Sequence, residues 1–128
     1  MKNSPAEVAF KLRQVFKEFP EGAFSYLFGS VAEGTAGPLS DIDIAVLLDP
    51  FRLESILPLH NALCRALKRD EIDLLILNQT KNIILLEEIV RHGILIYEKD
   101  PIARLDFEWK IIHQAIDFRE TRKRIFGA

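Results

Sequence analysis

The stretch FGSVAEGTAGPLSDIDIAVLLD, residues 28–49, joins two apolar runs through a glycine-rich turn. Asp41 and Asp43 stand at the start of the second run. Alternate residues of a strand point to the same face, so both carboxylates project together, with their Cα atoms roughly 7 Å apart. Like charges placed in this way repel unless a cation lies between them, and hard oxygen ligands suit Mg²⁺. The spacing therefore indicates a divalent-cation site.

The Gly29-Ser30 turn before the two carboxylates adds an element that can bind an anion. Backbone N–H groups of a glycine-rich turn, together with a hydroxyl, can face a phosphate group. Gly34, Gly37 and Pro38 then disfavour regular structure up to Ser40. An anion cradle beside a carboxylate pair indicates a metal–triphosphate site.

Helices and strands alternate on both sides of this stretch. The capping box Ser4-Pro5-Ala6-Glu7 predicts the start of a first helix. Asp49-Pro50 and Asp100-Pro101 predict the starts of two later helices. Apolar periodicity predicts helices over about 5–19, 50–67, 82–92 and 101–124, and strands over 23–28, 42–48, 71–77 and 94–97. The fold class is therefore α/β (α+β): a small mixed sheet flanked by helices, with an αβαβαβ core plus a C-terminal helix. Strand order does not follow from the sequence.

The length and composition of the chain bound its size and setting. Its 128 residues suffice for one domain, 1–128, with the motif core at about 23–77. With 17 Lys and Arg against 19 Asp and Glu, the formal charge of −2 disfavours a general attraction to nucleic acid or to anionic membranes. No run approaches the length of a membrane span, and the first residues lack the apolar core of a signal peptide. Cys64 has no second cysteine to pair with, so we expect a cytoplasmic protein.

A third acidic residue, Asp73, lies in the otherwise apolar stretch EIDLLIL, residues 71–77. An acid without a partner inside such a strand costs stability. Two interpretations are open: Asp73 is solvated at the strand end, or it joins Asp41 and Asp43 in a three-carboxylate metal site. The carboxylate pair favours the second. We expect the three carboxylates to converge at the rim of the sheet, with Gly29-Ser30 alongside.

Gly29-Ser30, then Asp41-x-Asp43, then a separate Asp73 on a later strand resembles the DNA polymerase β-like nucleotidyltransferase superfamily. The chain length and the turn resemble its minimal nucleotidyltransferase (MNT) antitoxin branch. The resemblance implies that Gly29 and Ser30 hold the β- and γ-phosphates of ATP, and that Asp41 and Asp43 bind the Mg²⁺ that accompanies them. It also implies that Asp73 joins those two aspartates in holding a second, catalytic Mg²⁺. The implied reaction is transfer of AMP from ATP to an acceptor hydroxyl.

The same resemblance implies that the acceptor is a tyrosine of a HEPN-domain ribonuclease toxin. Larger relatives that modify small molecules carry an acceptor-binding domain, for which this chain has no room. Two alternatives stay open: a non-catalytic antitoxin or binding module that blocks its partner by contact, and nucleotidyl transfer to RNA or to a small molecule. Glu33, where the MNT pattern usually carries Arg, favours the contact mechanism, whereas the complete set of aspartates favours the enzyme. His60, His92 and His113 are interpreted as helix residues rather than zinc ligands, and the basic run 119–124 as a solvated helix end.

The predicted C-terminal helix carries two apolar stripes. The first is expected to bury against the sheet and consists of Ile102, Leu105, Trp109, Ile112 and Ile116. The second either lies between core layers or forms an exposed interface, and it consists of Phe107, Ile111, Ala115, Phe118 and Ile125. An exposed stripe would bind either a HEPN-type partner or a second copy of the chain.

Overall fold

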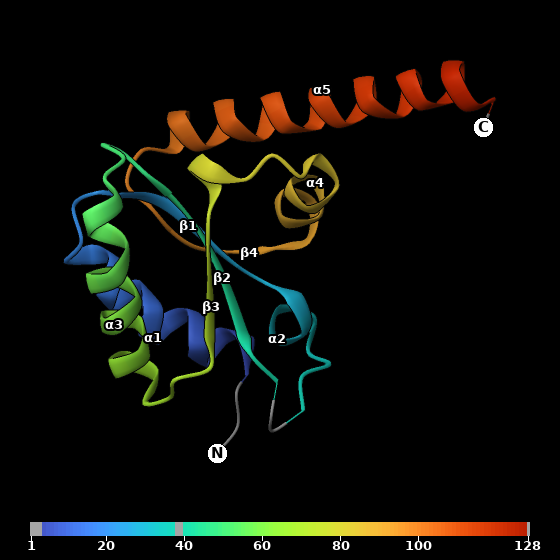
Figure 1. Cartoon of the computed structure of the whole chain (residues 1–128). Helices are drawn as coiled ribbons and strands as arrows, with labels where there is room; N and C mark the ends of the chain where they lie inside the picture. Colours follow the sequence, from blue (N-terminus) through green and yellow to red (C-terminus); the bar gives the residue numbers. More distant parts are fainter. Residues whose placement is uncertain (1–3, 38–39, 128) are drawn as a thin grey trace.

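The computed structural model describes residues 4–37 and 40–127, and Pro38 of the expected turn lies outside these ranges. Four strands form one sheet in the order β3-β2-β1-β4 (Figure 1). The elements along the chain are α1 (Pro5–Lys17), β1 (Gly22–Phe28), α2 (Gly29–Glu33), β2 (Ile42–Leu48), a 3₁₀ turn η1 (Leu53–Ser55), α3 (Ile56–Leu67), β3 (Ile72–Ile76), a 3₁₀ turn η2 (Leu77–Gln79), α4 (Ile83–His92), β4 (Ile94–Glu98) and α5 (Pro101–Phe126). The predicted α/β class with a mixed sheet is confirmed.

The sheet is mixed because its strands pair in two ways. β1 is antiparallel to both β2 and β4, whereas β2 and β3 run parallel. A parallel pair needs a crossover connection, and η1 with α3 supplies it between β2 and β3. As a result, β2 and β3 both begin at the end of the sheet that lies away from α5 (Figure 1).

Helices cover both faces of the sheet. α1 and α3 pack on one face, and α4 and α5 pack on the other (Figure 1). β2 alternates between the two cores: Ile42, Ile44, Val46 and Leu48 bury on the side of α1 and α3, while Ala45 faces α4 and α5. This alternation follows from the period of two along a strand.

Most predicted helix starts are confirmed by their capping contacts. The Ser4 side chain accepts a hydrogen bond from the backbone N–H of Glu7. The Asp100 carboxylate accepts from the N–H groups of Ile102 and Ala103. The start predicted at Asp49-Pro50 is wrong, because the chain there continues without helix until η1 and the α-helical part of α3 begins only at Ile56. The glycine-rich turn also contains a short helix, α2, that the sequence did not predict.

The prediction that the first stripe of α5 buries against the sheet is wrong, and the second stripe meets the core instead, which was one of its two interpretations. Ile111 and Ala115 of the second stripe are buried, and Phe107 packs against Phe24 of β1. The first stripe faces solvent instead, because Ile102, Leu105, Trp109 and Ile116 are exposed. From Ile116 to Gly127 every residue is exposed, and the end of α5 extends past α4 (Figure 1). The first stripe is therefore the one exposed to solvent, whereas the second is buried at Ile111 and Ala115 and exposed at Phe118 and Ile125.

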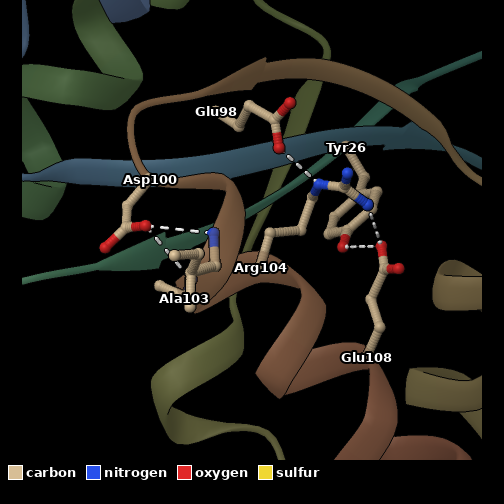
Figure 2. A network of polar contacts seen from close by, with 7 residues as sticks. Tyr26, Glu98, Asp100, Ala103, Arg104 and Glu108 are labelled. Atoms are coloured by element: carbon tan, nitrogen blue, oxygen red, sulfur yellow. Dashed lines mark hydrogen bonds and ion pairs between the residues drawn. The ribbon is translucent and has the colours of Figure 1, made fainter.

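A polar network fixes the N-terminal half of α5 to the sheet. Figure 2 shows the buried Tyr26 hydroxyl donating to a carboxylate oxygen of Glu108, with 2.6 Å between the oxygens. Arg104 bridges two carboxylates, with Nε 2.6 Å from Glu98 Oε1 and Nη1 3.0 Å from Glu108 Oε2. Burial and the Glu108 carboxylate raise the pKa of Tyr26 above its ordinary value, so the hydroxyl stays protonated and keeps donating.

Candidate active site

Asp43 and Asp73 are brought together by the parallel pairing of β2 with β3. The register sets Asp43 directly opposite Asp73. Their neighbours Ile42, Ile44 and Ile72 are buried on the side of α1 and α3, so both carboxylates project from the other face. Asp41 precedes Asp43 by two residues, so its side chain lies on the same side of the extended chain as that of Asp43. The three predicted site residues therefore lie at one end of one face of the sheet.

The three carboxylates also interact electrostatically. The pKa of Asp43 is raised above the ordinary aspartate value, first by burial and then by the negative charges of Asp73 and Asp41. Asp41 and Asp73 are exposed, whereas Asp43 is half-buried between them. The site therefore concentrates negative charge that solvent screens only in part.

Gly29 fits against this carboxylate group closely. Its φ of +76° lies in the left-handed region that favours glycine, and a Cβ built there would collide with a carboxylate oxygen of Asp43. Phe28, the residue before it, pairs directly with Asp43 across β1 and β2. Gly29 and Ser30 therefore begin α2 beside Asp43, where the sequence analysis placed a phosphate cradle.

Arg69 contacts the chain on both sides of the candidate site, a contact that the sequence did not predict. Its Nη2 donates to the carbonyl oxygen of Ser40 over 2.6 Å and lies 3.9 Å from Glu71 Oε1. These contacts tie the residue before Asp41 to the start of β3. The sequence carries no signal for this contact, because Arg69 is one of several basic residues at the end of a helix.

The donor set of the three aspartates fits Mg²⁺. Carboxylate oxygens are the ligands this ion prefers, and a cation here would offset both the burial of the Asp43 charge and the repulsion from Asp73 and Asp41, which together raise the pKa of Asp43. Within residues 4–37 and 40–127, no three His, Cys, Asp or Glu side chains are already gathered tightly enough to form a metal-binding cluster.

The remaining polar residues singled out in the sequence lie elsewhere. His60 contacts the carbonyl oxygen of Ile72 at 3.0 Å, and His113 stacks on Trp109 in α5. Glu33 ends α2 and is exposed. In the basic run at the end of α5, Arg119 pairs with Glu87 of α4 at 2.6 Å. Across the described part of the chain, no helix is both long and apolar enough to span a membrane.

Comparisons with protein families and solved structures show which known proteins this chain is similar to. The family described as polymerase beta, nucleotidyltransferase matches residues 11–102, most of the chain. A toxin–antitoxin complex solved with AMP-PNP contains a chain of 27% identity and TM-score 0.73, over 91% of this chain and 94% of that one. The toxin–antitoxin complex MntA-HepT contains a chain of 25% identity and TM-score 0.66, over 91% and 92% of the two chains.

A third structure has the same fold. It is a complex of a tri-AMPylated Shewanella oneidensis HEPN toxin with an MNT antitoxin, with 24% identity and TM-score 0.65 over 91% of this chain and 93% of that one. At that identity the likeness is one of fold alone. A comparison with curated protein sequences found no significant match.

Proposed function

Because the chain belongs to the polymerase β nucleotidyltransferase family, we propose that it transfers AMP from ATP to a hydroxyl group of a HEPN-type toxin and thereby acts as its antitoxin. The observation that carries this proposal is the direct pairing of Asp43 with Asp73, with Gly29 packed against Asp43. Two of the similar structures support the nucleotide and the partner: one is a toxin–antitoxin complex with the ATP analogue AMP-PNP, and another is the toxin–antitoxin complex MntA-HepT.

The donor nucleotide binds at the start of α2. Gly29 lets the backbone pass close to Asp43, and Ser30 adds a hydroxyl at the same turn. These two residues hold the β- and γ-phosphates, while the α-phosphate lies over the carboxylates. In this proposal the bond to be broken lies between the turn and Asp43.

Asp41, Asp43 and Asp73 would hold Mg²⁺, in a site for two ions. When bound, the cations supply charge neutralisation at the α-phosphate and lower the pKa of the acceptor hydroxyl. The aspartates supply oxygen ligands on two rigid strands, and Arg69 keeps the residue before Asp41 fixed to the start of β3. Positioning by strands rather than loops suits a reaction that depends on alignment.

The transfer breaks a phosphoanhydride bond of ATP and forms a phosphate ester bond to the acceptor. The acceptor oxygen forms a bond to the α-phosphorus of ATP, and the bond from that phosphorus to the oxygen bridging to the β-phosphate breaks. Pyrophosphate leaves with the electron pair, and the hydroxyl proton passes to solvent. AMP stays on the acceptor, so a modified toxin carries one added nucleotide per transfer.

Radiolabelled ATP tests the proposed reaction directly. The chain is incubated with Mg²⁺, a purified HEPN toxin, and ATP labelled on either the α- or the γ-phosphate. The α-label is expected on the toxin and the γ-label in pyrophosphate. Label from the γ-position on the toxin, or no transfer from either, would contradict the proposal.

A second candidate function is neutralisation by contact alone, in a binding module whose site is vestigial. Glu33 favours it, since an exposed acid at the end of α2 adds negative charge near the proposed phosphate cradle. An unlabelled toxin that is nevertheless inhibited in the presence of the chain would support this candidate. We further propose a cytoplasmic location, because the only cysteine, Cys64, is a free thiol.

A further inference from the structure

The C-terminal end of α5 is exposed along its whole length. Every residue from Ile116 to Gly127 is exposed, and this end extends past α4 (Figure 1). The second stripe, buried at Ile111 and Ala115, continues onto it as Phe118 and Ile125, which are 38% and 67% exposed. A helix end that packs on nothing is marginal in water, and an exposed apolar face on it is typical of a surface that a partner covers.

A groove of about 380 Å³ lies between this helix end and α4. Its apolar lining comes from both helices, with Ile83 and Ile84 from α4 and Phe118 from α5. Ile84 is 58% exposed, although Leu86 and Ile89 of the same helix are buried in the core. α4 therefore presents an apolar side chain to the groove that the fold itself does not use.

The charged side chains of the groove leave an excess of positive charge. Glu87 accepts from Arg119 at 2.6 Å and from Arg91 at 2.8 Å, so its negative charge is already balanced. Arg122 and Lys123 line the groove as well. Among the described residues, no carboxylate forms an ion pair with Arg122. The groove therefore combines an apolar surface with positive charge that the chain does not compensate.

These two properties together decide which occupant fits. A second copy that docked with the same surface would bring the positive charges of two grooves together, which is unfavourable. An RNA strand would match the positive charge, but the formal charge of the chain is −2, and Ile83 and Ile84 offer no ring on which a base can stack. A protein helix that carries Asp or Glu beside its apolar residues matches both properties.

We propose that the groove between α4 and α5 is a docking surface for an acidic amphipathic helix of the toxin. β2 and β3 begin, with Asp43 and Asp73, at the end of the sheet that lies away from α5 (Figure 1). A toxin held at the groove therefore leaves the carboxylates open, and docking is separate from the transfer reaction. This inference rests on the proposed function, because it takes the toxin as the partner.

Arg122→Glu tests the charge of the groove, with Arg65→Glu as its matched control. Both arginines are exposed and lie near the C-terminal ends of their helices, and Arg65 belongs to α3 on the other face of the sheet. The Kd for a purified HEPN toxin is measured by isothermal titration calorimetry without ATP or Mg²⁺. Arg122→Glu is expected to raise this Kd at least about tenfold, and Arg65→Glu should leave it unchanged.

Ile84→Asp tests the apolar part of the groove, with Phe10→Asp of α1 as its control. The two side chains are 58% and 61% exposed, so both variants should fold, which circular dichroism checks. Ile84→Asp is expected to raise the Kd for the toxin about tenfold, and Phe10→Asp should not change it. Higher ionic strength should weaken toxin binding by the wild type more than binding by Arg122→Glu.

Further measurements separate docking from transfer and from the other occupants. Asp43→Asn should bind the toxin with the wild-type Kd, so a chain that binds the toxin at the groove but transfers no AMP would contradict only the proposed reaction. Normal toxin affinity in both Arg122→Glu and Ile84→Asp would overturn the groove, as would a wild type that does not bind the toxin. A dimer of the chain alone that Arg122→Glu dissociates in light scattering, or a labelled single-stranded RNA that binds the wild type but not Arg122→Glu, would also overturn it.

Discussion

The two faces of the sheet differ most clearly along β2. On the face toward α1 and α3, its side chains at 42, 44, 46 and 48 are sealed in an apolar core. On the other face, Ala45 is buried under α4 and α5, but Asp43 remains half-exposed at the open end. One strand therefore carries a core and a candidate active site that are offset by a single residue.

This offset separates the residues that stabilise the fold from those proposed to serve the reaction. On the face toward α1 and α3, which we call the closed face, burial of apolar side chains stabilises the chain. On the face toward α4 and α5, which we call the open face, burial and then the negative charges of Asp73 and Asp41 raise the pKa of Asp43. Substitutions on the two faces should accordingly affect different measurements.

The largest effect is expected for Asp43→Asn on the open face. The amide keeps the shape of the side chain but removes the charge that holds a cation. We expect the rate of AMP transfer to fall by more than about 100-fold, because loss of outer-shell metal contacts alone costs roughly 10- to 100-fold. Asp106→Asn on the exposed side of α5 is the matched control and should keep the wild-type rate. Equal rates for the wild type and Asp43→Asn would exclude Asp43 as a ligand.

Ile44→Ala probes the closed face next to Asp43. Ile44 is fully buried, so its truncation should lower the free energy of unfolding by about 2–5 kcal/mol. Ile102→Ala on exposed α5 should change it by less than about 0.5 kcal/mol. Urea unfolding followed by circular dichroism measures both. A similar cost for the two variants would mean that the closed face does not supply the core.

A smaller effect is expected on the way stability changes with pH when no divalent cation is present. The folded-state pKa of Asp43 is raised above its unfolded value near 3.8, so folding favours the protonated form. Its contribution to stability is present below that value and is lost as pH rises through the folded-state pKa. Asp43→Asn should remove this loss and become more stable than the wild type toward neutral pH.

Glu87, at the contact of α4 with α5, is expected to contribute a pH dependence of stability opposite in sign to that of Asp43. Hydrogen bonds from Arg119 and Arg91 lower the pKa of Glu87, so its contribution to stability is present above the unfolded pKa and is lost as pH falls.

The contribution of Asp43 is isolated by the difference in Tm between Asp43→Asn and the wild type. This difference is measured from about pH 3 to about pH 7, a range around these pKa values. A Tm difference that stays constant with pH would contradict the raised pKa of Asp43.

The sequence alone predicted the local features of both faces. Residues 42–48 were expected as a strand and form β2 with those bounds. The caps at Ser4 and Asp100 were predictable because they depend on side chains within a few residues. The grouping of Asp41 with Asp43 follows from the same short-range rule. These features were predictable because they depend on residues that are close together in the sequence.

What the sequence left open depends on contacts between distant residues. The order β3-β2-β1-β4 and the contact of Arg69 with Ser40 have no local signal. The two stripes of α5 were correctly found, but periodicity does not say which stripe meets the core. Tyr26 and Glu98, distant in sequence, bind Glu108 and Arg104 and so turn the Phe107 side inward.

The central claim is that Asp41, Asp43 and Asp73 form one cation site together with the triphosphate. Mn²⁺ is an oxygen-binding substitute for Mg²⁺, and its free concentration can be followed by electron paramagnetic resonance. In the presence of AMP-PNP, the wild type is expected to bind two Mn²⁺ per chain, Asp73→Asn one, and Asp43→Asn neither at comparable concentration. Unchanged Mn²⁺ stoichiometry and affinity in both variants would contradict the account.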